Sequence, residues 1–110
     1  MNEGIIYLLV DWGSNPERVK IGITKENVEK RIKQLQTGSP NELVLLNKYK
    51  SKNYKKIERF LHKKYNKYST DGGKEWFELP SDAIINFISE CQKIDYQFQT
   101  IIDSDNPFIS

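Results

Sequence analysis

The sequence predicts an α+β fold, in which a small, mainly antiparallel three-stranded sheet is flanked by helices. Two segments near the start are rich in β-forming residues and joined by a turn, which is typical of a β-hairpin. Later segments repeat apolar residues every three or four positions, which is typical of helices that pack on a core. The 110 residues have room for one modest core, so we expect one domain over residues 1–100 and a loose tail over 101–110.

The first two elements are predicted strands of one hairpin, over residues 5–10 and 18–24. The segment between them contains Gly, Ser, Asn and Pro, which is turn chemistry. The hairpin therefore places Tyr7 and Lys20 on adjacent strands. Gly22 follows Lys20 by two positions, so it lies on the same strand face as the lysine.

The next element is a predicted helix, which either Thr24 or Asn27 can cap. Its apolar residues recur at helical spacing, and Gly38 ends the run. Arg31 lies at the edge of the apolar stripe. We therefore expect the helix to hold the stem of Arg31 while its guanidinium group reaches outward.

A third strand over residues 43–49 precedes a second helix, which we expect over about 53–68. Glu58 and His62 are four residues apart and share one face of this helix. The side chains expected on its buried side are Ile57, Phe60 and Leu61.

The C-terminal third contains the stretch EWFEL, which predicts a short strand-like piece docked on the core. Ser81 is predicted to cap a last helix. Its expected inner side consists of Ile84, Ile85, Phe87, Ile88, Cys91 and Ile94.

The composition excludes several classes of protein. No apolar run approaches the roughly 20 residues of a membrane span, and no basic segment followed by a long apolar one marks a secretory signal. The single cysteine, Cys91, excludes an internal disulfide and a cysteine-rich zinc site. We therefore expect an intracellular protein, cytoplasmic or nuclear, without membrane contact and with a monomer as the default state.

The net charge of +2 is unevenly distributed along the chain. Nine of the seventeen Lys and Arg residues lie between Lys48 and Lys67, and Glu58 is the only acid among them. Past Thr70 acidic residues outnumber basic ones. The basic segment indicates a polyanionic partner, although a solvated helix face would explain the charge alone equally well.

Four residues from these elements form a set that suits phosphodiester cleavage. Arg31 would stabilise negative charge on the phosphate, and Tyr7 would act as general base for water, with Lys20 favouring its phenolate. Glu58 would hold Mg²⁺ or Mn²⁺, which takes its other ligands from water and the substrate phosphate. Gly22 would leave a floor for the scissile phosphate, because glycine in a strand allows close approach.

Five stretches of the chain resemble the motifs of the GIY-YIG endonuclease family, in the small phage and viral subtype often called the T5orf172 or Mug113 type. They are IIYLL, VKIGIT, EKRIKQLQTGSP, IERFLHKKY and GKEWFEL, in that order along the chain. The similarity covers about residues 4–79. The order of the five motifs carries the resemblance, because none of them is specific alone.

This resemblance implies a role for each matching residue. Tyr7 would be the general base, and Lys20, in the place of the second motif's tyrosine, would orient or activate the water and the phenol. Gly22 is the glycine of the same motif. Arg31 would contact the scissile phosphate, and Glu58 would bind the divalent metal.

The expected substrate-binding set is wider than the matched motifs. His62 falls where this subtype often carries a histidine, one turn after the glutamate. Leu35, in contrast, stands where many members carry a histidine. The expected substrate-binding residues are Gly22, Thr24, His62, Lys55 and Arg59.

These residues predict a divalent-metal-dependent endonuclease, with DNA favoured over RNA as the nucleic acid. The resemblance to a phage and viral subtype also allows a viral or phage protein that acts inside a host. Two other interpretations stay open. One is a module of the same fold that binds nucleic acid through the basic helix without cleaving it. The other is an interaction protein that binds a host protein through the acidic C-terminal third.

Overall fold

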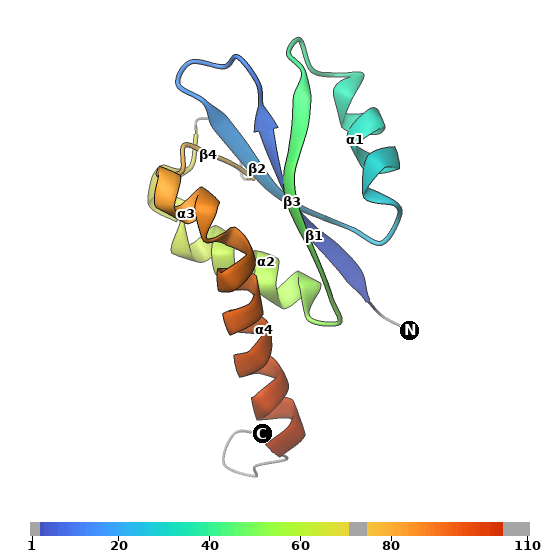
Figure 1. Ribbon diagram of the computed structural model, residues 1–110, viewed down its shortest axis with the longest axis vertical. Helices are drawn as coiled ribbons and strands as arrows, with labels where there is room; N and C mark the ends of the chain where they lie inside the picture. Colours follow the sequence, from blue (N-terminus) through green and yellow to red (C-terminus); the bar gives the residue numbers. More distant parts are fainter. Residues whose placement is uncertain (1–2, 71–74, 105–110) are drawn as a thin grey trace.

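The computed structural model describes residues 3–70 and 75–104, and it places four strands in one antiparallel sheet in the order β3-β1-β2-β4. Helix α1 covers one face of the sheet, and α2 and α4 cover the other (Figure 1). The predicted α+β fold is confirmed, and a short fourth strand extends the three predicted ones. The elements are β1 (Gly4–Asp11), β2 (Arg18–Thr24), α1 (Val28–Gln36), β3 (Leu43–Ser51), α2 (Tyr54–Lys64), the 3₁₀ helix η1 (Asn66–Tyr68), β4 (Trp76–Phe77), α3 (Ser81–Ile85) and α4 (Phe87–Ser104).

The register of the β1–β2 hairpin determines which side chains share a face. Tyr7 lies opposite Gly22, and Leu9 lies opposite Lys20. Because successive strand residues point to opposite faces, these four residues face the side of the sheet that α1 covers. The intervening residues of both strands face α2 and α4.

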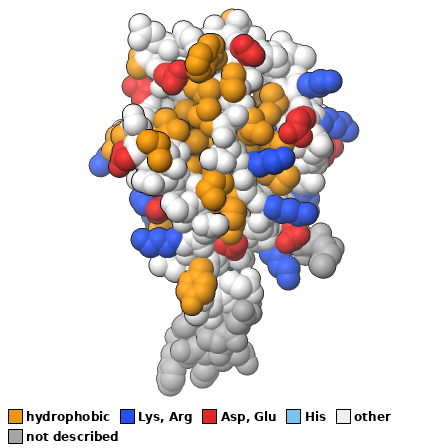
Figure 2. Space-filling model, in the orientation of Figure 1, with side chains coloured by type: hydrophobic (Ala, Val, Ile, Leu, Met, Phe, Trp, Pro, Cys, Tyr) orange, Lys and Arg blue, Asp and Glu red, His pale blue; other side chains and the backbone are white. Residues whose placement is uncertain are grey.

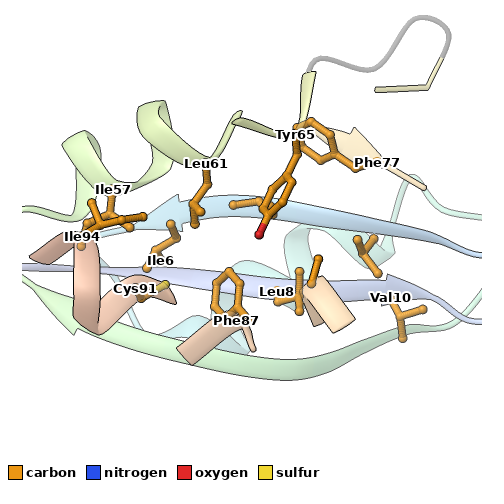
Figure 3. Close-up of a cluster of buried hydrophobic side chains, with 13 residues drawn as sticks. Ile6, Leu8, Val10, Ile57, Leu61, Tyr65, Phe77, Phe87, Cys91 and Ile94 are labelled. Carbon is orange, nitrogen blue, oxygen red and sulfur yellow. The ribbon is translucent and has the colours of Figure 1, made fainter. Parts of the chain in front are cut away.

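The larger core lies between the sheet and the pair α2 and α4. Figure 3 shows Ile57 and Leu61 of α2 meeting Ile6 and Leu8 of β1, with Cys91 of α4 packed against the same strand. All five side chains are fully buried. The smaller core on the other face joins Tyr7 and Leu9 to Val28 of α1 and Leu43 of β3.

The sequence left open which residue caps α1, and the structure assigns this role to Asn27. Its Oδ1 accepts a hydrogen bond from the backbone N–H of Lys30 at 3.1 Å. The hydroxyl of Thr24 instead accepts a hydrogen bond from the N–H of Glu26 at 3.0 Å, in the turn that precedes the helix. Thr24 thereby shapes the entry to α1.

The second predicted helix is shorter than expected. Helix α2 ends at Lys64, and the chain continues into η1, because the N–H of Tyr68 bonds back to the carbonyl of Tyr65 over three residues instead of four. Phe60, expected on the buried side, is 43% exposed. It lies three residues from Ile57, at the boundary of the buried stripe, where the neighbouring helix leaves part of the ring uncovered.

The last predicted helix is divided into α3 and α4. Asn86, with φ −92° and ψ 12°, separates them, and Ser81 makes no side-chain cap. Ile85, expected on the inner side, is 77% exposed, because it lies about 100° around the helix axis from Ile84 and away from the side that carries Phe87 and Cys91. Helix α4 continues through Ser104, so residues 101–104 of the expected tail are helical, while 105–110 lie outside the described residues.

Candidate active site

The phenol of Tyr7 lies over the backbone of Gly22. Tyr7 is only 1% exposed, and a Cβ built at Gly22 would stand 2.5 Å from the Tyr7 hydroxyl oxygen. Only a glycine therefore accepts this ring position. The expectation that Gly22 leaves a floor for a phosphate is corrected here, because the phenol itself fills that space.

Arg31 approaches the Tyr7 hydroxyl from α1, which packs on the same face of the sheet. Burial raises the pKa of Tyr7 above its ordinary value, whereas the hydrogen bond and the positive charge of Arg31 act in the opposite direction. One guanidinium nitrogen of Arg31 also donates to Oε1 of Gln34 at 3.2 Å, which holds the group along the helix. Arg31 and Tyr7 thus form one pair, as the sequence predicted for two parts of one site.

Lys20 is buried beside Tyr7 but has a different partner. Its ammonium group lies 3.1 Å from Oε1 of Glu75 and 5.7 Å from the centre of the Trp76 ring. The expectation from the sequence is that Lys20 lowers the pKa of Tyr7. In the structure the cation with that effect is Arg31.

The edge of β2 that faces away from β1 pairs with β4 through Val19 and Lys20 among the described residues. The N–H of Ile21 bonds to the carbonyl of Glu75, and the carbonyl of Ile21 lies 2.8 Å from Nε2 of His62. Because a carbonyl can only accept, Nε2 of His62 carries the proton. His62 therefore fastens α2 against this edge, which gives it a positioning role.

Glu58 lies one turn before His62, with Oε2 3.8 Å from its Nε2 and 19% of the side chain exposed. Burial raises the pKa of Glu58, and the charge of Glu75 raises it further, while His62, Lys20 and Arg59 act to lower it. Glu58 and Glu75 also raise the pKa of Tyr7. Tyr7 is therefore within electrostatic range of Arg31 and Glu58, and Glu58 is within range of Lys20.

The remaining predicted substrate-binding residues, Thr24, Lys55 and Arg59, differ in their exposure. Thr24 is buried in its turn and does not present its hydroxyl to the surface. Lys55 and Arg59 are exposed on α2, where Arg59 directly follows Glu58. These two cations border the site on its solvent side.

Glu75 and Trp76 also contact Lys20 in this site, although the EWFEL stretch that contains them was expected only to dock on the core. Trp76 also lies under the guanidinium group of Arg18, 5.5 Å from the ring centre. A signal was present in the sequence, because a lysine on a buried strand face requires a carboxylate partner. The EWFEL stretch that docks on the core offers Glu75 as that partner.

Glu58 is the carboxylate that the sequence predicts as a metal ligand. Among residues 3–70 and 75–104 there is no group of three or more His, Cys, Asp or Glu side chains that could hold one. A cation at Glu58 would accordingly take most of its ligands from water and a substrate, which is the usual behaviour of Mg²⁺.

Comparison with known families agrees with this geometry. The chain belongs to the T5orf172 domain family, whose model matches residues 4–92 and which is associated with a GIY-YIG-like nuclease fold. The match spans β1 through the first turns of α4 and includes every residue of the candidate site. No match was found among curated proteins or among solved structures.

Proposed function

We propose that this protein is a divalent-metal-dependent endonuclease that hydrolyses phosphodiester bonds in DNA. The observation that carries the proposal is that Tyr7 lies within electrostatic range of Arg31 and Glu58, and Glu58 within range of Lys20, although the four residues come from four different elements. Ion pairs that only stabilise a fold do not require a buried tyrosine hydroxyl among them. Membership of a family associated with a nuclease-like fold supports the same function.

Arg31 and Tyr7 would have two separate roles in the reaction. The guanidinium group of Arg31 would stabilise the negative charge that develops on the phosphate oxygens. Tyr7 would accept the proton of the attacking water, and the hydrogen bond from Arg31 favours its phenolate form. Burial holds Tyr7 in the protonated form before substrate binds, so the phenolate would form only in the assembled complex.

Lys20 would orient the attacking water next to Tyr7. Its position is fixed on two sides, by the carboxylate of Glu75 and by the ring of Trp76. A lysine that is buried and paired loses little conformational freedom when substrate binds. Glu75 is therefore a positioning residue for Lys20 in this proposal.

A divalent cation fits the chemistry of Glu58. This carboxylate is largely buried, and burial raises its pKa although His62, Lys20 and Arg59 act to lower it, so a divalent cation would further stabilise its ionised form. When bound, Mg²⁺ or Mn²⁺ would supply charge neutralisation at the phosphate. His62 would hold Glu58 in position through its bond to the backbone of Ile21.

The test compares wild type with Glu58→Gln in a cleavage assay on plasmid and on labelled single strands, with Mg²⁺, with Mn²⁺ and with chelator. We expect metal-dependent cleavage that falls more than about 100-fold in the variant, while DNA binding is retained. The matched control is Glu3→Gln, whose exposed carboxylate pairs with Lys50 at 3.8 Å next to the start of β1. We expect this control to cleave within about twofold of wild type.

Wild-type protein that binds DNA in a salt-sensitive way but never cleaves it would overturn the proposal. That result would favour the non-cleaving binding module. Cleavage that survives unchanged in Glu58→Gln would overturn the metal-ligand role of this residue.

A further inference from the structure

Two hollows lie side by side along the groove between α2 and α4, and the ring of Phe60 lines both. One has a volume of about 320 Å³ and the other about 670 Å³. Figure 1 shows the two helices crossing beside one another on the outer side of the sheet. The groove lies on the opposite side of α2 from Glu58.

Aromatic rings form the floor of the smaller hollow. Phe60 is 43% exposed, and Phe98 of α4 lies across from it and is partly buried against the core. The ammonium group of Lys56 lies 5.7 Å from the centre of the Phe98 ring. An exposed phenylalanine beside a second ring offers a flat apolar surface that the fold itself does not fill.

The rim of the groove is strongly basic. Lys56, Arg59 and Lys63 line the smaller hollow, and the other described residues that line it are the two phenylalanines. In the larger hollow the acidic lining residue is Glu90, and Lys64 neutralises it through an ion pair. A ligand that combines negative charge with flat apolar groups therefore matches this surface.

We propose that the groove between α2 and α4 binds the unpaired bases of single-stranded DNA. This proposal rests on the proposed function, since it names the substrate class of the same site. Bases would stack on Phe60 and Phe98, while Lys56, Arg59 and Lys63 would contact the phosphates. A duplex does not fit, because its bases are already stacked and paired and cannot present their faces to a ring.

The groove and the candidate active site lie on opposite sides of one helix. Arg59 follows Glu58 in sequence, and a helix with its side chains is about 10–12 Å across. A single strand that crosses the exposed face of α2 would therefore pass from one to the other. Arg59 would contact the strand at this crossing, so the protein would act on DNA that carries a single-stranded arm.

The test measures DNA binding in chelator, so that no cleavage is needed for a readout. Fluorescence anisotropy would compare a labelled single-stranded oligonucleotide with a duplex of the same sequence. Phe60→Leu keeps an apolar side chain but removes the stacking surface, and we expect it to weaken single-strand binding about tenfold. We expect duplex binding to change by less than about twofold.

Two further variants guard against a merely structural effect. Phe60→Tyr keeps the ring and should bind single strands within about twofold of wild type. Tyr96→Leu removes an exposed aromatic ring that lies on α4 outside the groove and should have no effect. Thermal unfolding of each variant would show that the fold is retained.

Equal weakening of single-strand and duplex binding by Phe60→Leu would overturn the proposal, and so would no weakening of either. These outcomes are separate from failure of the proposed function. A protein that binds single strands through Phe60 but never cleaves would contradict the nuclease while leaving the groove intact.

Discussion

The position of the Tyr7 ring at the centre of the site depends on its close contact with Gly22. A Cβ at Gly22 would meet the hydroxyl oxygen, Cζ and Cε1 of Tyr7 at 2.5, 2.6 and 2.9 Å. The ring is fully buried, so it cannot swing into solvent to avoid the contact. The phenol would have to leave its place beside Arg31.

We therefore expect Gly22→Ala to lower the cleavage rate at least tenfold and to destabilise the fold by about 1–3 kcal/mol, as overpacking does. Cleavage and thermal unfolding measured on the same preparation would separate the two effects. The matched control is Gly38→Ala, where nothing lies within 4 Å of the added methyl group. A Gly22→Ala variant as active as wild type would show that catalysis does not require the phenol in this position.

The residue types of the site were predictable from the sequence, but their pairing was not. Strand register alone places Tyr7, Lys20 and Gly22 on one face. The partner of Lys20 is Glu75, which lies 55 positions later in the sequence. Two helices stand between them, and the local sequence pattern does not specify how these helices dock. The cation that lies next to the Tyr7 hydroxyl depends on how α1 docks on the sheet. The observed docking brings Arg31, and not Lys20, to this position.

Helix α4 is held to the sheet by a polar anchor as well as by its apolar side. The carboxylate of Asp95 accepts hydrogen bonds from the Tyr49 hydroxyl at 2.7 Å and from Ser51 Oγ and Asn53 Nδ2 at 2.8 Å. Asn53 immediately precedes α2, so the anchor connects α4 to the start of the helix that carries Glu58. Asp95 lies beyond residue 92, where the family match ends.

We expect Asp95→Asn to lower the free energy of unfolding by about 1–2 kcal/mol at pH 7, because hydrogen bonds to a charged acceptor are lost or weakened. Burial raises the pKa of Asp95, but the hydrogen bonds from Asn53, Tyr49 and Ser51 outweigh it and leave the pKa below its ordinary value. A lowered pKa in the folded state adds stability that is present above about pH 4 and lost as the pH falls through the folded value.

Urea unfolding at pH 7 and at pH 2.5 would test this dependence. The difference between wild type and Asp95→Asn should shrink at the lower pH, and Glu78→Gln, an exposed acid, serves as the control. A difference of equal size at both pH values would contradict the role assigned to the ionised carboxylate.

Element types were predicted well, while element ends were less predictable. β2 was placed over residues 18–24, as observed, because its alternation is bounded by turn residues on one side and by the cap of α1 on the other. The break at Asn86 had no such signal, since the apolar residues around it fit one continuous helix almost as well. Tertiary packing of Phe87, Cys91 and Ile94 against the sheet selects the phase of α4.

The fold separates the basic residues between Lys48 and Lys67 into two regions. Lys48, Lys50 and Lys52 lie on or just beyond β3, at the sheet edge opposite β4, whereas Lys55 and Arg59 lie on α2 beside the candidate site. On the face drawn in Figure 2, Lys and Arg side chains gather at the two flanks, with hydrophobic side chains between them. A run of charge in sequence therefore does not amount to one binding surface.

Salt dependence of DNA binding distinguishes these two regions. Each phosphate contact contributes about 0.7 to the slope of log K against log salt for a single strand, through counterion release. We expect Lys55→Gln combined with Arg59→Gln to reduce the slope by about 1.4, measured by anisotropy between about 50 and 200 mM KCl in chelator. The matched control, Lys48→Gln with Lys50→Gln, removes two exposed cations from β3, which pair with Glu29 and Glu3, and should leave the slope unchanged. A reduced slope in the β3 control and none in the α2 variant would place the DNA along β3, and would contradict a strand that crosses α2 at Arg59.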